Sequence, residues 1–116
     1  MYRNAVWLLV LAAAQPVALW AAETDSPSSR QADGEAIYQF ACAHCHDSGQ
    51  GGAPVIGKEA GWTSRSNLWE AVLFEHARSG YLAMPAGGGD MRLTEYDIEV
   101  AGEYMLQATF PDRPED

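Results

Sequence analysis

Two cysteines and a histidine stand together near the middle of the chain, in the run Cys42-Ala43-His44-Cys45-His46. At this spacing two thiols, one helical turn apart, can form thioethers to the two vinyl groups of a porphyrin. The next side chain, His46, is then held under the iron as an axial ligand. The motif therefore predicts one covalently attached haem c, with Cys42 and Cys45 as its attachment points.

The same pair of cysteines is also typical of two other kinds of site. A thioredoxin-like redox site needs a neighbouring strand–helix–strand pattern, and no strong strand signal lies nearby. A structural zinc site needs four ligands. Because the chain has only two cysteines, His44 or His46 would have to complete that site together with His76. We therefore favour haem over zinc binding and over dithiol chemistry.

A methionine in a glycine-rich loop is the candidate for the second axial ligand. Pro85 restricts Met84 to an extended conformation, and the glycines downstream allow a tight return of the chain. Ligation by methionine and histidine raises the potential of a haem. Met91 in the same loop and His76 on a neighbouring helix are competing candidates, although helical periodicity explains His76 without a ligand role. Met105 is expected in the core.

Three helices are expected to position these residues, which makes the predicted fold class all-α. The first begins with Asp33 as its N-cap and ends with the haem motif. The second spans Asn67–Ser79, before Gly80, and the third spans Thr94–Ala108. The glycine-rich connections are expected to be loops that approach the cofactor closely.

The N-terminus has the layout of a secretory signal peptide, which we predict to span residues 1–22. A short positive start precedes the apolar run Ala5–Ala14, and small residues follow at Ala21 and Ala22. The run is short for a membrane span, which needs about 20 apolar residues. We therefore predict cleavage and a periplasmic location. The alternative is an uncleaved segment that anchors the protein to the inner membrane.

The remaining chain is predicted to form one domain. Residues 23–32 are polar and read as a flexible leader, residues 33–110 as the haem domain, and residues 111–116 as a polar tail. There is no internal repeat and no second haem motif, so one haem is expected.

The chain is strongly acidic, with 7 Lys and Arg against 16 Asp and Glu and a formal net charge of −9. This charge argues against nucleic acid as a partner, because nucleic-acid-binding surfaces are basic. It permits redox protein partners with basic docking faces and salt-sensitive association. The alternative is that the acidity serves solubility alone.

The residues from Gly34 to Gln107 resemble class I c-type cytochromes, and among them bacterial cytochrome c5. The matching features are the haem motif, Gly34 with Tyr38, Gly52-Ala53-Pro54, Trp62 with Arg65, Ala83-Met84-Pro85, Gly87-Gly88 and the final helix with Glu103-Tyr104-Met105. Two departures stand out. Ala86 and Gly87 occupy positions where members often carry a second proline and a basic residue, and an extra cysteine pair found in some members is missing.

This resemblance implies a fold and a set of site residues. The small cytochrome c fold would pack about three main helices around the haem, with the first and last crossing near Gly34, Tyr38, Ala101 and Tyr104. The carbonyl of Pro54 would accept a hydrogen bond from His46. Trp62 and Arg65 would lie near a haem propionate, and Met84 would be the second axial ligand.

The expected function is electron transfer by a soluble monohaem cytochrome in a respiratory or related periplasmic chain. An iron with both axial positions filled by protein has no open site for a substrate, and no nucleophile triad or carboxylate pair stands out, so we do not expect an enzyme. The chain could instead be a redox subunit of a larger oxidoreductase complex. If Met84 does not bind iron, a ligand-binding or sensory haem protein becomes the alternative.

Overall fold

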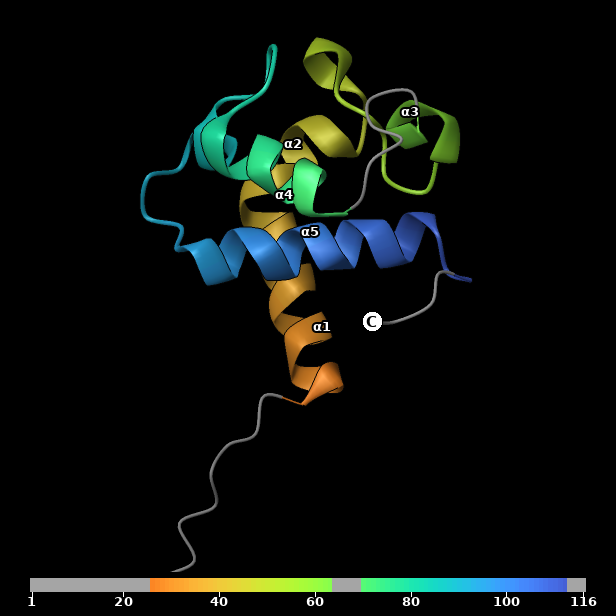
Figure 1. Cartoon of the computed structure of the whole chain (residues 1–116), viewed down its shortest axis with the longest axis vertical. Coiled ribbons are helices and arrows are strands. Elements are labelled where there is room, and N and C mark those ends of the chain that lie inside the picture. Colours follow the sequence, from red (N-terminus) through yellow and green to blue (C-terminus); the bar gives the residue numbers. More distant parts are fainter. Residues whose placement is uncertain (1–25, 64–69, 113–116) are drawn as a thin grey trace, which may run out of the picture.

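The structure is a computed structural model that describes residues 26–63 and 70–112. Within these ranges it is helical and contains no strand, only an isolated bridge between Tyr81 and Met84. The expected all-α class is confirmed. The elements are α1 (Pro27–Ile37), a π-helical turn (Tyr38–Cys42), α2 (Ala43–His46), a 3₁₀ turn (Gln50–Gly52), α3 (Glu59–Thr63), α4 (Glu70–Ser79), a second 3₁₀ turn (Ala86–Gly89) and α5 (Glu95–Thr109) (Figure 1).

The first helix starts earlier than the sequence analysis expected. The side chain of Ser26 caps α1 by accepting a hydrogen bond from the N–H of Ser29 at 3.3 Å, and Pro27 opens the helix. Arg30 then reaches α5, where a terminal guanidinium nitrogen lies 2.6 Å from the carboxylate of Glu103. The expected N-cap at Asp33 is therefore wrong, and the predicted flexible leader is helical from Pro27 onward.

The helix continues through a π-turn into the haem motif. In that turn the N–H of Ala43 donates to the carbonyl of Tyr38, five residues back. Such turns are rare and often lie at functional sites. The short helix α2 follows directly and carries Cys45 and His46. A π-turn holds one residue more than a turn of α-helix, so the side chains of the haem motif face a different direction from the one that a continuous α-helix would give them.

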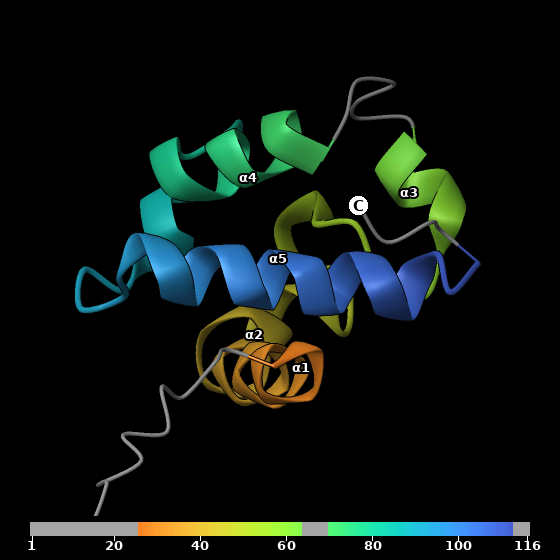
Figure 2. The same cartoon turned by 60° about the horizontal axis from the view of Figure 1, so that its bottom comes forward.

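Helices α1 and α5 cross at very close range. A Cβ atom added at Gly34 would lie 2.2 Å from the carbonyl oxygen of Val100 and 2.9 Å from Cβ of Tyr104. The rings of Tyr38 and Tyr104 pack beside this contact with centroids 5.4 Å apart, and Ala101 is fully buried. Figure 2 shows α1 end-on beneath α5, so the crossing implied by the resemblance is present.

Tyr38 also ties this crossing to the segment after the haem motif. The side chain is buried, and its hydroxyl donates to the carboxylate of Asp47. Burial and then this hydrogen bond raise the pKa of Tyr38 above its ordinary value. The hydroxyl therefore stays protonated and keeps its role as donor across the physiological pH range.

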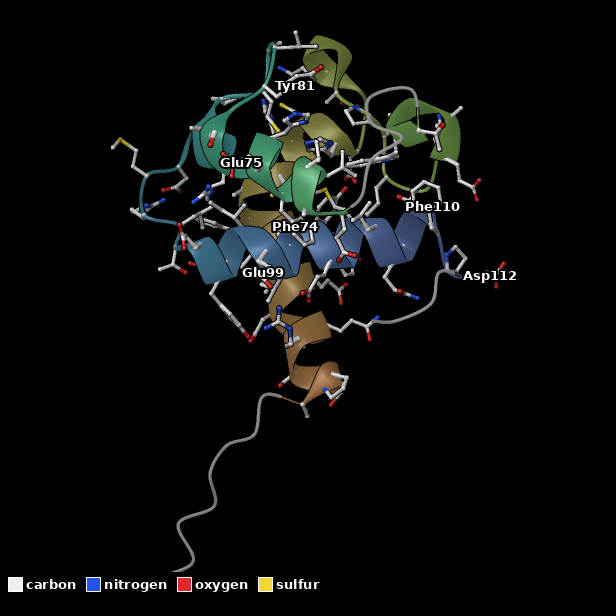
Figure 3. All side chains as sticks on the ribbon, in the orientation of Figure 1. Phe74, Glu75, Tyr81, Glu99, Phe110 and Asp112 are labelled. Atoms are coloured by element: carbon white, nitrogen blue, oxygen red, sulfur yellow. The ribbon has the colours of Figure 1, made fainter. Side chains whose placement is uncertain are left out.

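The other two expected helices are present with small differences at their ends. The start of the predicted 67–79 helix lies outside the described residues, and α4 ends at Ser79 with Gly80 at a positive φ of 86°. Thr94 caps α5 in a reciprocal arrangement with Asp97, as expected. At Gly102 an added Cβ would lie 2.5 Å from Cε1 of Phe74, so α4 packs tightly on α5 there, as Figure 3 shows for Phe74.

No helix in the described part of the chain is long and apolar enough to cross a membrane. The predicted signal peptide, residues 1–22, and the last four residues of the predicted tail lie outside that part.

The close crossing at Gly34 can be tested by substitution to alanine. In a free helix this change is favourable by about 1 kcal/mol. Here the added methyl group meets the backbone of Val100, and overpacking of this kind destabilises by about 1–3 kcal/mol. We expect Gly34→Ala to lower the free energy of unfolding of the haem-loaded protein, measured by denaturant titration. Glu35→Ala, on the exposed side of the same turn, should change it by less than about 0.5 kcal/mol. Equal stability of Gly34→Ala and the wild type would contradict the observed packing.

Candidate haem site

One cavity of about 420 Å³ is lined by residues of α2, α3, α4 and α5 and of the loops that follow α2 and α4. Its lining includes six of the seven site residues named from the sequence, which are Cys42, Cys45, His46, Pro54, Trp62 and Met84. The seventh, Arg65, lies outside the described residues. Leu73, Phe74 and His76 of α4 and Met105 of α5 close the cavity from the side of the other helices.

The two cysteines are half-buried, and no disulfide joins them. Burial raises the pKa of the Cys42 thiol to about 11, and the nearby Cys45 adds to that rise. A free Cys42 is therefore neutral at physiological pH. A pocket that favours a neutral thiol also tolerates the uncharged thioether that haem attachment would put in its place.

The imidazole of His46 is buried and held from two sides. Its Nδ1 lies 2.8 Å from the carbonyl oxygen of Pro54, which is the contact that the resemblance implies. The ring stacks on Trp62 with centroids 5.5 Å apart and planes 19° apart. When Nδ1 donates its hydrogen to a carbonyl, the lone pair of Nε2 is left free for a metal and becomes more basic.

Trp62 lines the cavity and also holds a neighbouring loop in place. Its indole N–H donates to the carbonyl oxygen of Val55 at 3.0 Å. The N–H of Ile56 donates to the carbonyl of His46 at 2.9 Å. Trp62 thus fixes the 54–56 segment against α2 and covers one face of His46.

Met84 lines the same cavity from the loop after α4. Its competitor Met91 is 99% exposed and does not line the cavity. Met105 is buried in the core, as expected, and also reaches the cavity from α5. His76 lines the cavity too, and its ring is stacked on Tyr81. Tyr81 was not singled out from the sequence, because a lone aromatic residue in a loop carries no spacing signal.

The described cavity lining contains no Asp, Glu, Lys or Arg, although the chain as a whole has a formal net charge of −9. Three arginines pair with carboxylates elsewhere in the structure. Arg30 binds Glu103, Arg78 binds Glu95 at 3.0 Å, and Arg92 binds Asp90 at 2.6 Å. An apolar cavity lined by two thiols, by the oriented imidazole of His46 and by the thioether of Met84 fits haem c, because these groups suffice to attach it and to ligate its iron.

Comparisons with known proteins show which family the chain is similar to. A family model described as cytochrome c oxidase, cbb3-type, subunit III matches residues 29–105. The chain is 37% identical over 79 residues to cytochrome c-555 of Chlorobaculum tepidum, covering 65% of this chain and 73% of that protein. It is 37% identical over 78 residues to cytochrome c-551 of Halorhodospira halochloris, covering 64% and 95%.

The fold has a solved counterpart as well. It superimposes with a TM-score of 0.61 and 32% sequence identity, over 66% of this chain and 94% of the other, on a chain from the crystal structure of an electron transfer complex of nitrite reductase with cytochrome c. The sequence and structure matches together span the haem motif, most of the cavity and most of α5. The chain therefore belongs to the cytochrome c family, as a small class I c-type cytochrome that carries covalently bound haem c and serves as an electron carrier rather than an enzyme.

Proposed function

We propose that this cytochrome carries single electrons with His46 and Met84 as the two axial ligands and with Cys42 and Cys45 as the thioether attachments. The observation that carries the proposal is that all four side chains line one apolar cavity, with Nδ1 of His46 held at 2.8 Å by Pro54. Haem c supplies a one-electron couple at its iron.

The surrounding residues favour electron exchange with little rearrangement. Pro54 and Trp62 fix the imidazole of His46 on one side. Met84 belongs to a loop that is hydrogen-bonded back to Tyr81. Two protein ligands leave no open position for a substrate, and burial and axial ligation then set the potential. This arrangement favours a carrier over a ligand-binding or sensory protein.

The partners of this cytochrome are redox proteins, and we propose that their docking faces are basic. The net charge of −9 supports this, as does the pairing of Arg30, Arg78 and Arg92 with carboxylates, which leaves little positive potential around them. The family description as an oxidase subunit favours a second possibility, a permanent place in a larger oxidoreductase complex.

We further propose that the protein works in the periplasm. The layout of residues 1–22 as a signal peptide supports export. Haem c is attached only after the chain has crossed the membrane, so an attachment motif and an export signal are expected to occur together.

Met84→Ala tests the second axial ligand. We expect the oxidised variant to lose the weak charge-transfer band of iron–thioether ligation, and the reduced variant to bind carbon monoxide, which the closed wild-type site resists. The potential should fall, because methionine ligation raises it. Met91→Ala is the matched control, since this methionine is 99% exposed and lies outside the cavity lining. A band that persists in Met84→Ala would show that another sulfur binds the iron.

The intact mass of the purified protein tests export and attachment together. We expect a chain that begins near Glu23 and carries the mass of one haem. The Cys42→Ala/Cys45→Ala double variant should begin at the same residue and should lack the mass of the haem. A full-length chain would favour the membrane anchor, and a mature wild-type chain without added mass would refute the haem site.

The proposed docking charge predicts opposite salt effects for two inorganic oxidants of similar size. Rates with a cationic complex should fall as ionic strength rises, and rates with an anionic complex should rise. Stopped-flow absorbance of the reduced protein measures both. Glu99→Gln and Glu95→Gln, made together on exposed parts of α5, should weaken both trends. Rates that do not depend on salt would indicate that the acidity does not guide docking.

A further inference from the structure

Two stacked rings line the cavity beside Met84, and the proposed electron transfer assigns neither of them a role. His76 lies in the last turn of α4, and Tyr81 follows that helix by two residues. Their ring centroids are 3.8 Å apart, and their planes differ by only 7°. His76, Tyr81 and Met84 all line the same cavity. Figure 3 labels Tyr81, at the end of the molecule above α4.

The backbone links Tyr81 closely to Met84. The N–H of Tyr81 donates to the carbonyl of Met84 at 3.0 Å, and the N–H of Met84 donates to the carbonyl of Tyr81 at 2.9 Å. The four residues therefore form a tight turn, whose tip residue Leu82 has a φ of 52° and is 80% exposed. Because the two hydrogen bonds are reciprocal, a displacement of Tyr81 must carry the backbone of Met84 with it.

The end of α4 provides the fixed side of this arrangement. The N–H of Gly80 donates to the carbonyl of His76 at 2.9 Å, and Gly80 turns the chain with a φ of 86°. A Cβ at Gly80 would lie 3.1 Å from the carbonyl oxygen of Met84, so the turn folds back closely on the helix end. Because Phe74 packs α4 on Gly102 of α5, the ring of His76 is mounted on a helix that is held by the core.

We propose that His76 and Tyr81 form an aromatic clamp that holds the Met84 turn against the cavity. His76 is thus a positioning residue and not an iron ligand, an inference that rests on the proposed ligation by Met84. For the Met84 sulfur to leave the iron, the turn must swing away, and Tyr81 must then slide off His76. The stack therefore opposes opening of the site to external ligands.

Free imidazole is the probe for this opening, because it binds the ferric iron only in the place of the methionine sulfur. We expect His76→Ala and Tyr81→Ala each to tighten imidazole binding by about 2- to 12-fold, the range of a lost aromatic pair. The His76→Ala/Tyr81→Ala double variant should bind no more tightly than either single variant, because the same contact is lost only once. His76→Phe and Tyr81→Phe keep a ring at each position and should stay near the wild-type affinity.

The charge-transfer band of the oxidised protein is the second readout, and it should weaken in the two alanine variants and recover in the two phenylalanine variants. Glu75→Gln is the matched control, since Glu75 precedes His76 on α4 but is exposed, where it binds Arg78 and Ser79 (Figure 3). It should leave imidazole affinity unchanged. Circular dichroism and thermal unfolding show whether each variant keeps its fold.

Two results would overturn the clamp but not the proposed ligation by Met84, provided that the wild-type protein shows the charge-transfer band. One is wild-type imidazole affinity in a folded His76→Ala variant, and the other is full additivity of the two alanine substitutions. A wild-type protein without the band would overturn the ligation proposal and the clamp with it.

Discussion

The close contact between α1 and α5 at Gly34 is the constraint on which the rest of the structure depends. With no Cβ at this position, the backbone of α1 approaches Val100 directly, and Tyr38 packs on Tyr104 one turn later. The haem motif follows Tyr38 within the same run of helix, so its position is set by this crossing. A larger residue at Gly34 would push α1 away from α5 and would move Cys42 relative to α4 and Met105, which close the cavity from the other helices.

The cofactor completes a small core. In the described residues the buried cluster consists of Tyr38, Trp62, Met105 and Leu106, with several partly buried residues around it. A domain of this size buries only a modest apolar surface. An apolar macrocycle fixed in the cavity would contact Trp62 and Met105 from within and would add to that surface. We therefore expect the protein without haem to be much less stable than the loaded protein.

Charged side chains lie on the surface of the described structure and are absent from the described lining of the cavity. The described cavity lining contains no Asp, Glu, Lys or Arg, while carboxylates and their arginine partners lie on α1, α4, α5 and the loop before α5. An uncharged lining disfavours water and ions in the cavity, whereas an acidic surface acts over a distance of about 10 Å at an ionic strength of about 0.1 M. Mutations of the surface carboxylates can therefore change the attraction between the protein and a partner without changing the contacts inside the cavity.

The sequence by itself determined the kind of chemistry, because the attachment motif for haem c is local and places Cys42, Cys45 and His46 within five consecutive residues. The pattern of residues also predicted the all-α class and the cap of α5 at Thr94. The family resemblance predicted the contact of His46 with Pro54. The tertiary structure decided what depends on residues distant in sequence. Helix α1 begins at Pro27, within the predicted leader, and Arg30 of this helix pairs with Glu103 of α5. Met84 lines the cavity whereas Met91 is exposed outside it, and the stack of His76 on Tyr81 appears only when α4 and its loop are folded together. These contacts arise from packing between elements, which the spacing of residues along the chain does not encode.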